Sequence, residues 1–331
     1  MDVITRDEFE DLLGAFALDA CDSDEMAAVE RYIGAHPDVS GEVERLRAAA
    51  AGLAASDALA PPRDVRASVL ERARARRAPR AQTPVEVHTE VEATLVELLD
   101  DVPESALDFP THNGLTVREL VAHLAAMESV LAMWMGVPTL PEVEDERIEE
   151  RTAAVVAMTR GWAFADVIAL WRRSMAAVRA AAPGSATSRW FGSEMPTDLV
   201  LLVRAFETWT HTDDIRRSLG RALDSPSASA LRTMAEGSMT MVPSALQKSG
   251  LARPGRSARI VLTGPGGGDW TVPMEVGAGV GLPDVTLTLP VVDWCRCFSE
   301  RLGPDELDLS VHGDRELGVA VVAAAPVYAF L

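Results

Sequence analysis

The sequence predicts a mainly α protein with a small mixed domain at its carboxyl end. Apolar residues make up 48% of the chain but aromatic residues only 5%. Ala, Leu and Val must therefore fill most of the interior, a balance that favours helices over a large sheet. From about residue 85 to 250 the apolar residues recur with helical spacing, whereas after residue 255 they alternate as in strands. The 331 residues suffice for two or three domains.

Residues 1–60 form a helical module of three short helices, which we expect in DEFEDLLGAFALDA, DSDEMAAVERYIGAH and DVSGEVERLRAAAAGLAA. Either Asp22 or Ser23 would cap the second helix, which has acidic residues in its first turn. Residues 61–84 begin and end with proline and contain an arginine-rich segment. This composition predicts an amphipathic helix followed by a flexible linker.

Residues 85–250 contain four long segments with helical periodicity, and loops with Pro or Gly separate them. This arrangement is typical of a four-helix bundle. The segments are VEVHTEVEATLVELLDDV, TVRELVAHLAAMESVLAMWMG, AFADVIALWRRSMAAVRAAA and PTDLVLLVRAFETWTHTDDIRRSLG, and a further helical stretch follows.

Residues 251–331 combine strand-like and helical segments, which indicates a small α+β domain. SARIVLTG and DWTVPMEV flank the sequence GPGGG, which predicts the turn of a β-hairpin. DVTLTLPVVDW and DLSVHG alternate as further strands, and DWCRCFSERLG and the last 18 residues read as helices.

Charge and cysteine content restrict the class of partner. A net charge of −19 argues against direct nucleic-acid binding, because a phosphate backbone requires a basic surface. It suits a basic partner, or it only keeps the protein soluble. Cys21, Cys295 and Cys297 cannot build a disulfide framework. The sequence has no secretory signal and no run of 18 apolar residues, so we expect a cytoplasmic protein that does not bind a membrane.

Glu207 and His211 lie four residues apart in AFETWTHTDDIRRSLG, a spacing that places both side chains on one helix face. Such a pair is either a surface interaction or part of a metal site. His123 lies on an apolar stripe, where a histidine is more often a core residue than a ligand. Together the three form a His…Glu-x-x-x-His set on two helices, as in metal sites of helical bundles. Three such ligands are typical of a catalytic zinc site with one open position.

Residues flanking this set have two interpretations each. Asp214 is the better candidate to orient a ligand histidine through a hydrogen bond, whereas we interpret Asp213 as solvated. Arg204, Arg216 and Arg217 carry guanidinium groups that suit a substrate carboxylate. We interpret these three as exposed helix charges instead.

TVRELVAHLA and ETWTHTDDIRRSLG resemble the two signature segments of the mycothiol-dependent maleylpyruvate isomerase family, and DFPTHNGLTVRELVAHL also fits it. The resemblance covers about residues 85–331. It implies a DinB-like four-helix bundle and a C-terminal α+β domain. It also implies a divalent metal, with zinc as the first candidate, bound by His123, Glu207 and His211. It further implies a low-molecular-weight thiol such as mycothiol and a small acid as ligands.

The N-terminal segment FEDLLGAFALDACDSDEMAAVERYIGAH and its continuation resemble the anti-sigma domain of proteins that sequester extracytoplasmic-function sigma factors. APPRDVRASVLERARARR resembles the fourth helix and connector of that family. Zinc-binding relatives have a histidine and a Cys-x-x-Cys pair where this chain has Tyr32, His36 and Val39. The zinc site is therefore lost, as in members of that family that pack apolar side chains in its place.

This second resemblance implies a sigma factor as partner. The apolar residues expected to contact it are Leu12, Leu13, Phe16, Leu18, Val65, Val69 and Leu70. Alternatively, these helices pack on the bundle as a structural extension, since buried and partner-facing stripes share one pattern.

Both resemblances together predict a soluble anti-sigma factor whose metal-binding domain senses a thiol, a metal or a small acid. The alternative is an enzyme, a metal- and thiol-dependent isomerase or S-transferase with an accessory N-terminal module. A third possibility is a metal-stabilised scaffold without turnover.

Overall fold

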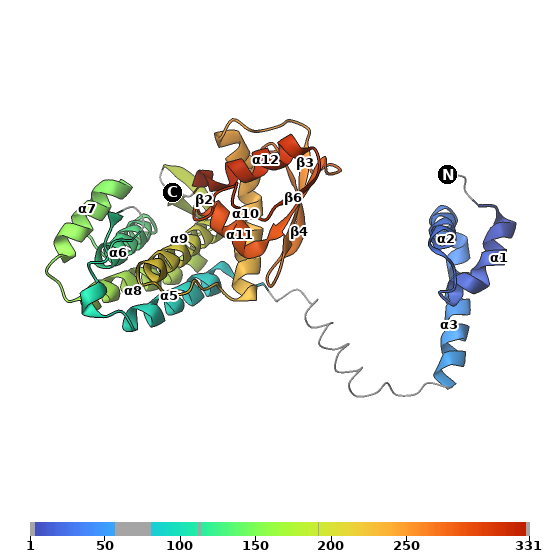
Figure 1. Ribbon diagram of the computed structural model, residues 1–331, viewed down its shortest axis with the longest axis horizontal. Coiled ribbons are helices and arrows are strands. Elements are labelled where there is room, and N and C mark those ends of the chain that lie inside the picture. Colours follow the sequence, from blue (N-terminus) through green and yellow to red (C-terminus); the bar gives the residue numbers. More distant parts are fainter. Residues whose placement is uncertain (1–3, 57–80, 112–113, 191, 329–331) are drawn as a thin grey trace. The chain divides into compact units, whose positions relative to one another are not determined.

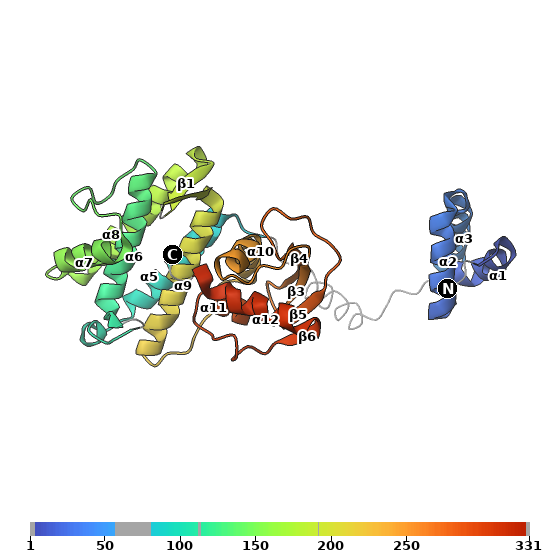
Figure 2. The same cartoon turned by 90° about the horizontal axis from the view of Figure 1, so that it is seen from above.

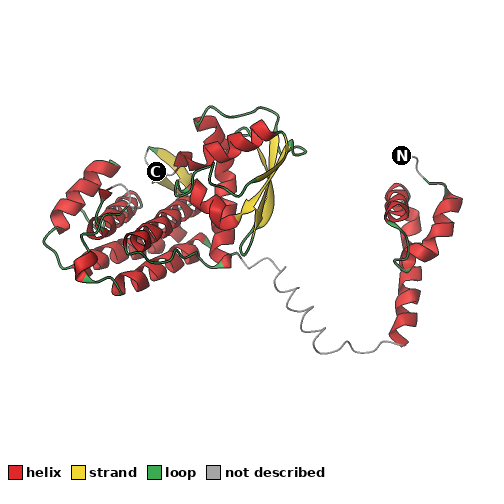
Figure 3. Cartoon of the chain, viewed as in Figure 1, coloured by secondary structure: helices red, strands yellow, loops and turns green. Residues whose placement is uncertain are grey.

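The structure is a computed structural model that describes residues 4–56, 81–111, 114–190 and 192–328. The chain divides into two compact units, Met1–Arg76 and Arg77–Leu331. Within the described residues the protein is mainly α, as predicted, and its few strands lie in the larger unit (Figure 3). The further boundary expected between residues 250 and 251 stays a prediction. No helix in the described ranges combines the length and apolar character needed to cross a bilayer.

The smaller unit contains the three predicted helices. They are α1 (Arg6–Ala17), α2 (Ser23–Ala35) and α3 (Ser40–Ser56), with a 3-10 turn at Pro37–Val39. The helix α1 starts at a capping box between Thr5 and Glu8, and α2 starts at a second one in which Asp22, one of the two expected caps, accepts the first backbone N–H groups. Their shared core consists of Phe9, Leu13, Phe16, Val29, Tyr32, Val39 and Val43.

The side chains expected to contact a partner differ in accessibility. Leu13 and Phe16 belong to the core of the smaller unit and are 4% and 3% exposed, and Leu12 packs against them. Leu18, in contrast, is 68% exposed. Val65, Val69 and Leu70 lie outside the described residues. The apolar stripe of α1 therefore packs against the core of the smaller unit. Among the residues expected to contact a partner that the structure describes, Leu18 is the exposed one.

A four-helix bundle forms the first part of the larger unit (Figure 1). Its helices are α5 (Pro84–Asp100), α6 (Val117–Trp134), α8 (Phe164–Ala181) and α9 (Thr197–Ser218). They match the four predicted segments, with α5 packed along α9 and α6 along α8. The N-termini of α5 and α6 carry capping boxes, in which Thr83 pairs with Glu86 and Thr116 with Glu119.

Two elements of the larger unit were not predicted from the sequence. One is α7 (Ile148–Thr159), which packs on α6. Its buried residues are Arg151, Val155 and Thr159, so two of the three are polar and apolar periodicity does not reveal the helix. The other is the hairpin β1 (Thr187–Trp190) and β2 (Ser193–Pro196), whose strands are four residues long.

The carboxyl-terminal part has one mixed sheet in the order β4-β3-β5-β6. Its strands are β3 (Ser257–Thr263), β4 (Gly268–Pro273), β5 (Val285–Pro290) and β6 (Ser310–Gly313). The strands β3 and β4 form the hairpin predicted around GPGGG, and β3 pairs with β5 in parallel. Alternate residues of β3 and β5 are buried under helices, which are α10 (Ala228–Lys248), α11 (Val291–Phe298) and α12 (Arg315–Ala324).

The helix α9 lies between the rest of the bundle and this carboxyl-terminal part (Figure 2). One hydrophobic core continues from α5 across α9 and α10 into the sheet. Sixteen of the 22 residues of α9 are buried, including charged ones. Charged side chains of α9 therefore need partners from other elements, and these partners form the candidate site.

Candidate metal centre

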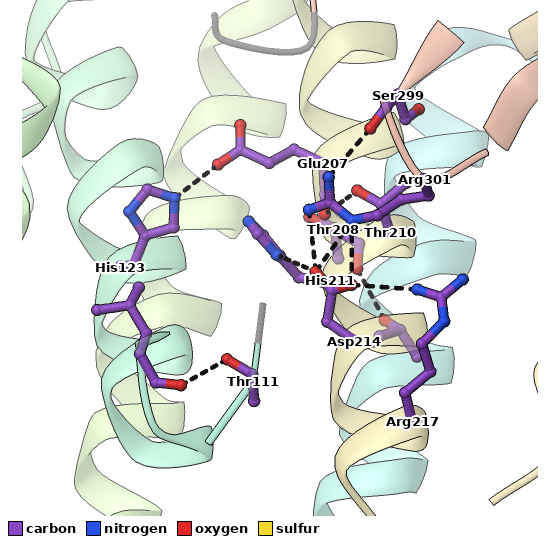
Figure 4. Close-up of polar contacts among 12 residues, drawn as sticks. Thr111, His123, Glu207, Thr208, Thr210, His211, Asp214, Arg217, Ser299 and Arg301 are labelled. Carbon is purple, nitrogen blue, oxygen red and sulfur yellow. Dashed lines mark hydrogen bonds and ion pairs between the residues drawn. The ribbon is translucent and has the colours of Figure 1, made fainter. Parts of the chain in front are cut away.

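The helices α6 and α9 bring the three predicted ligands together (Figure 4). His123 comes from α6, and Glu207 and His211 come from successive turns of α9. One potential ligand atom of each side chain lies within 4.8 Å of the others. His123 Nε2 is 3.1 Å from Glu207 Oε1, and the two imidazole rings meet edge to face with centroids 5.4 Å apart. The expected helix-face pair is thus not a surface interaction.

His123 is held from behind by α7. Its Nδ1 lies 2.8 Å from the hydroxyl oxygen of Thr152. A hydroxyl group donates or accepts, so Thr152 remains satisfied in either tautomer of the ring. When Thr152 accepts from Nδ1–H, the lone pair of Nε2 faces Glu207 and His211. Thr152 then holds His123 in the way that hydrogen-bond partners orient the ligand histidines of metal sites.

His211 is oriented by Asp214 on the same helix. Its Nδ1 is 3.0 Å from Asp214 Oδ2, which fixes the tautomer with the proton on Nδ1 and leaves Nε2 free. Burial lowers the pKa of His211, although the hydrogen bond to Asp214 acts in the opposite direction. A neutral imidazole with a free Nε2 is the form that binds a metal ion.

Asp214 is in turn held by an arginine from the carboxyl-terminal part. Arg301 donates from Nε to Oδ1 at 3.0 Å and from Nη2 to Oδ2 at 2.9 Å, and Arg217 Nη1 donates to Oδ1 at 3.2 Å. Glu300, just before Arg301, has a left-handed backbone with φ of 56° that ends α11. Burial raises the pKa of Asp214, but His211 and Arg301 outweigh it and hold that pKa at about 2.

Glu207 offers one carboxylate oxygen to the site and the other to Arg204. Arg204 Nη1 pairs with Glu207 Oε2, while Oε1 faces His123. Burial raises the pKa of Glu207, but the charge of Arg204 outweighs this effect and holds that pKa at about 2. Glu207 is therefore an anion at neutral pH, as a ligand must be.

The prediction that Arg204 is an exposed charge was wrong. Its side chain is 0% exposed, because α9 is covered by the bundle on one side and by the carboxyl-terminal part on the other. Its position in the apolar run LVLLVRAF was the sequence signal for burial. Arg217 is 40% exposed and bonds to Asp214, whereas Arg216 is largely covered and pairs with Asp224.

The interpretation of Asp213 as solvated was also wrong. Asp213 is 1% exposed and accepts from Arg296 of α11 at 3.1 Å. Burial raises the pKa of Asp213, against the opposing effect of Arg296. Asp213 and Asp214 thus form two successive ion pairs between α9 and the carboxyl-terminal part, and only Asp214 contacts a proposed ligand.

Sequence reasoning missed three residues that support the proposed ligands: Thr152 contacts His123 directly, Arg301 acts through Asp214, and Glu128 acts through Arg204. Thr152 lies on a helix whose buried face is partly polar, and Arg301 is 90 positions after His211. Glu128 occupies the apolar face of α6 and bonds to Arg204. A lone acid within HLAAMESVLAM was the available signal for Glu128.

The donor set fits a divalent transition metal. Two imidazole nitrogens and one carboxylate oxygen form a common ligand set of catalytic zinc sites. The second polar atom of each side chain is already bonded to Thr152, Arg204 or Asp214. Among the residues that the structure describes, this is the group of His, Cys, Asp and Glu side chains close enough to share an ion.

The two cysteines of α11 do not add to this site. Cys295 and Cys297 are both 0% exposed, and burial raises the pKa of each thiol, that of Cys297 to about 12. Burial therefore keeps both as neutral thiols at neutral pH, and neither belongs to the group of side chains close enough to share an ion with His123.

Residues 88–216 match the family model described as the mycothiol maleylpyruvate isomerase N-terminal domain. This range includes His123, Glu207 and His211 but begins after the smaller unit. Comparison with solved structures finds the crystal structure of the mycothiol-dependent maleylpyruvate isomerase and that of a point mutant of it. Both structures have 18% sequence identity to this chain and a TM-score of 0.47. Each match covers 69% of this chain and 91% of the chain of the solved structure. Comparison with curated proteins finds no match.

Proposed function

We propose that the larger unit binds one divalent metal ion, with zinc as the first candidate, and uses this ion together with a low-molecular-weight thiol such as mycothiol. The ligands are His123, Glu207 and His211, and the reaction is an isomerisation or thiol transfer on a small acid. The observation that carries this proposal is the convergence of three oriented donor atoms from α6 and α9 within 4.8 Å. The family match over residues 88–216 supports the choice of thiol.

The residues of the chain prepare the site for this chemistry. Asp214 and Thr152 fix the two imidazoles, so that the free nitrogens face one point. Arg204 occupies one oxygen of Glu207 and so leaves a three-ligand set. A metal with three protein ligands has a position for a thiolate or water and lowers the pKa of the group bound there.

The direct test is metal content and turnover of the full chain. Purified protein should contain close to one equivalent of metal and should isomerise maleylpyruvate only when mycothiol is added. His123→Ala should lose both metal and turnover. The matched control is His312→Ala, because His312 is an exposed histidine on β6. Metal-dependent turnover in His123→Ala would refute the assignment.

Different results would separate the remaining alternatives. Metal binding without turnover for any thiol tested would favour the scaffold, in which the metal only stabilises the fold. No metal in the wild-type protein, with the fold intact by circular dichroism, would refute the proposed site altogether.

A second candidate function concerns the smaller unit, for which we propose binding of an extracytoplasmic-function sigma factor. The supporting observation is the packing at three positions where zinc-binding anti-sigma relatives have ligands. Tyr32 stacks between Phe9 and His36, with centroid distances of 4.6 and 4.1 Å, and Val39 is 2% exposed. Aromatic and apolar packing at these positions is what a zinc-free member of that family would have, and it supports the proposal.

Co-elution of the full chain with the sigma factor encoded beside it tests this second function. Leu18→Asp should abolish co-elution, because Leu18 is an exposed apolar side chain of the smaller unit. Leu223→Asp, at an exposed leucine of the larger unit, is the matched control. Equal co-elution of both variants and the wild type would exclude Leu18 from the contact. The absence of any complex would leave the enzyme as the sole proposal.

A further inference from the structure

A buried ion-pair network adjoins the carboxylate oxygen of Glu207 that does not face His123. Arg204 Nε donates to Glu128 Oε1 at 2.8 Å, while its Nη1 pairs with Glu207 Oε2. His88 Nε2 lies 3.6 Å from the same Glu128 oxygen. The side chains of His88, Glu128 and Arg204 are each 0% exposed and come from α5, α6 and α9.

Stability alone does not account for this network. Burying an ion pair costs so much solvation that apolar side chains of similar size are often at least as stabilising. In addition, Glu128 Oε2 and Arg204 Nη2 have no hydrogen-bond partner within the described part of the chain, and a buried polar atom without one is destabilising. A network with this cost calls for a role beyond packing.

The network also cannot bind a substrate carboxylate in two-point fashion. Nε and Nη1 of Arg204 are already bonded to Glu128 and Glu207. Only Nη2 remains, and the side chain is fully buried. What Arg204 does contact is one of the three proposed ligands, so its effect must pass through Glu207.

We infer that Arg204, held by Glu128, is a positioning residue that limits Glu207 to one ligand oxygen. This inference rests on the proposed metal site. Glu207 can bind a metal through one oxygen or through both, and both would add a fourth protein contact. Because the positively charged guanidinium group of Arg204 pairs with Oε2, it repels a cation from that oxygen and leaves Oε1 for the ion. Glu128 is required because its bond to Nε fixes the plane of the guanidinium group.

The expected consequence is an open coordination position. With a single oxygen from Glu207, three protein atoms bind the ion and one position of a tetrahedron remains for a thiol or water. Arg204 also neutralises part of the charge of Glu207, so the ion keeps more of its power to acidify the group bound to it. We call the pair of Arg204 and Glu128 the brace. Without it, the second carboxylate oxygen of Glu207 would occupy this open position.

Cobalt substitution of the full chain tests the inference. Four-coordinate cobalt(II) has intense visible bands, and these weaken when the coordination number rises. Glu128→Leu/Arg204→Met removes both charges of the Arg204–Glu128 pair, and in the cobalt-loaded protein the ion remains as the cation that faces Glu207. The matched control is Arg259→Met/Asp269→Leu, which removes an ion pair of the β3–β4 hairpin that contacts neither Glu207 nor the buried network.

We expect the wild type and the control to share the intense bands, and the brace variant to lose most of that intensity. Identical bands in all three proteins would overturn the inference and leave the metal site standing. A wild-type protein that binds no cobalt would overturn the metal site itself, and the inference with it. If the brace variant does not fold, as judged by its thermal melt, Glu128→Gln is measured in its place. This single change is expected to weaken the bands in part, and unchanged bands would again overturn the inference.

Discussion

Asp214→Asn perturbs the most heavily braced residue of the site. Asp214 is 3% exposed and accepts hydrogen bonds from His211, Arg301 and Arg217. Its pKa is held at about 2, against a usual value of 3.8. Because one pKa unit corresponds to 1.36 kcal/mol, the ionised carboxylate contributes about 2 kcal/mol to the free energy of unfolding. The asparagine variant should lose about that amount at pH 7.

The sign of the pH dependence follows from the lowered pKa of Asp214. A carboxylate whose pKa falls on folding stabilises the protein above its unfolded pKa, and this contribution disappears as the pH falls from about 4 to 2. The difference between wild type and Asp214→Asn should therefore be largest at neutral pH and shrink towards pH 3. Urea denaturation of the metal-free proteins at several pH values measures it.

Asp269→Asn serves as the control for this experiment. Asp269 also pairs with an arginine, Arg259, but both side chains are nearly half exposed on the β3–β4 hairpin. Exposed ion pairs contribute little, so this variant should resemble the wild type. Equal stability of Asp214→Asn and wild type at pH 7 would refute the reasoning, as would a difference that does not change with pH.

Three further perturbations test other parts of the site. Thr152→Val removes the partner of His123 Nδ1 and should weaken zinc binding about tenfold in a chelator competition, with Thr152→Ser restoring it; equal affinity in all three would contradict the role of Thr152. Arg151→Met removes the hydrogen bonds that Arg151 donates to the carbonyl oxygens of Ala126, Val143 and Asp145 and should lower the free energy of unfolding by about 3 kcal/mol in urea. Zinc at a hundredfold excess over its dissociation constant should stabilise the wild type by about 2.7 kcal/mol in a thermal melt, whereas His211→Ala should not respond.

The fold was largely predictable because local signals and the final packing agree. The apolar stripe predicted around His123 is buried in α6, and Thr116 and Glu119 form a capping box at the start of that helix. The position of His123 on that stripe, and of Glu207 one turn before His211, follows from helix geometry alone. The sequence therefore predicts the proposed ligand set, His123, Glu207 and His211.

The partners of these ligands could not be predicted, because they depend on tertiary packing. Thr152 reaches His123 from a helix with a partly polar buried face. Arg204 is buried because the rest of the bundle and the carboxyl-terminal part both cover α9. Leu13 and Phe16 show the same limit in the smaller unit, since a single apolar stripe does not say whether the chain itself or a partner covers it.

The reach of Arg301 across the core has a consequence for how this protein could be cut or recombined. The range that matches the family model, residues 88–216, contains every proposed ligand but stops well before Arg301. A fragment of that length would keep the donor atoms and lose the guanidinium group that steadies Asp214 behind His211. Gene rearrangement or protein engineering that exchanges the carboxyl-terminal part must therefore supply an equivalent cation. Otherwise it alters the proposed metal site without changing any of the three proposed ligands.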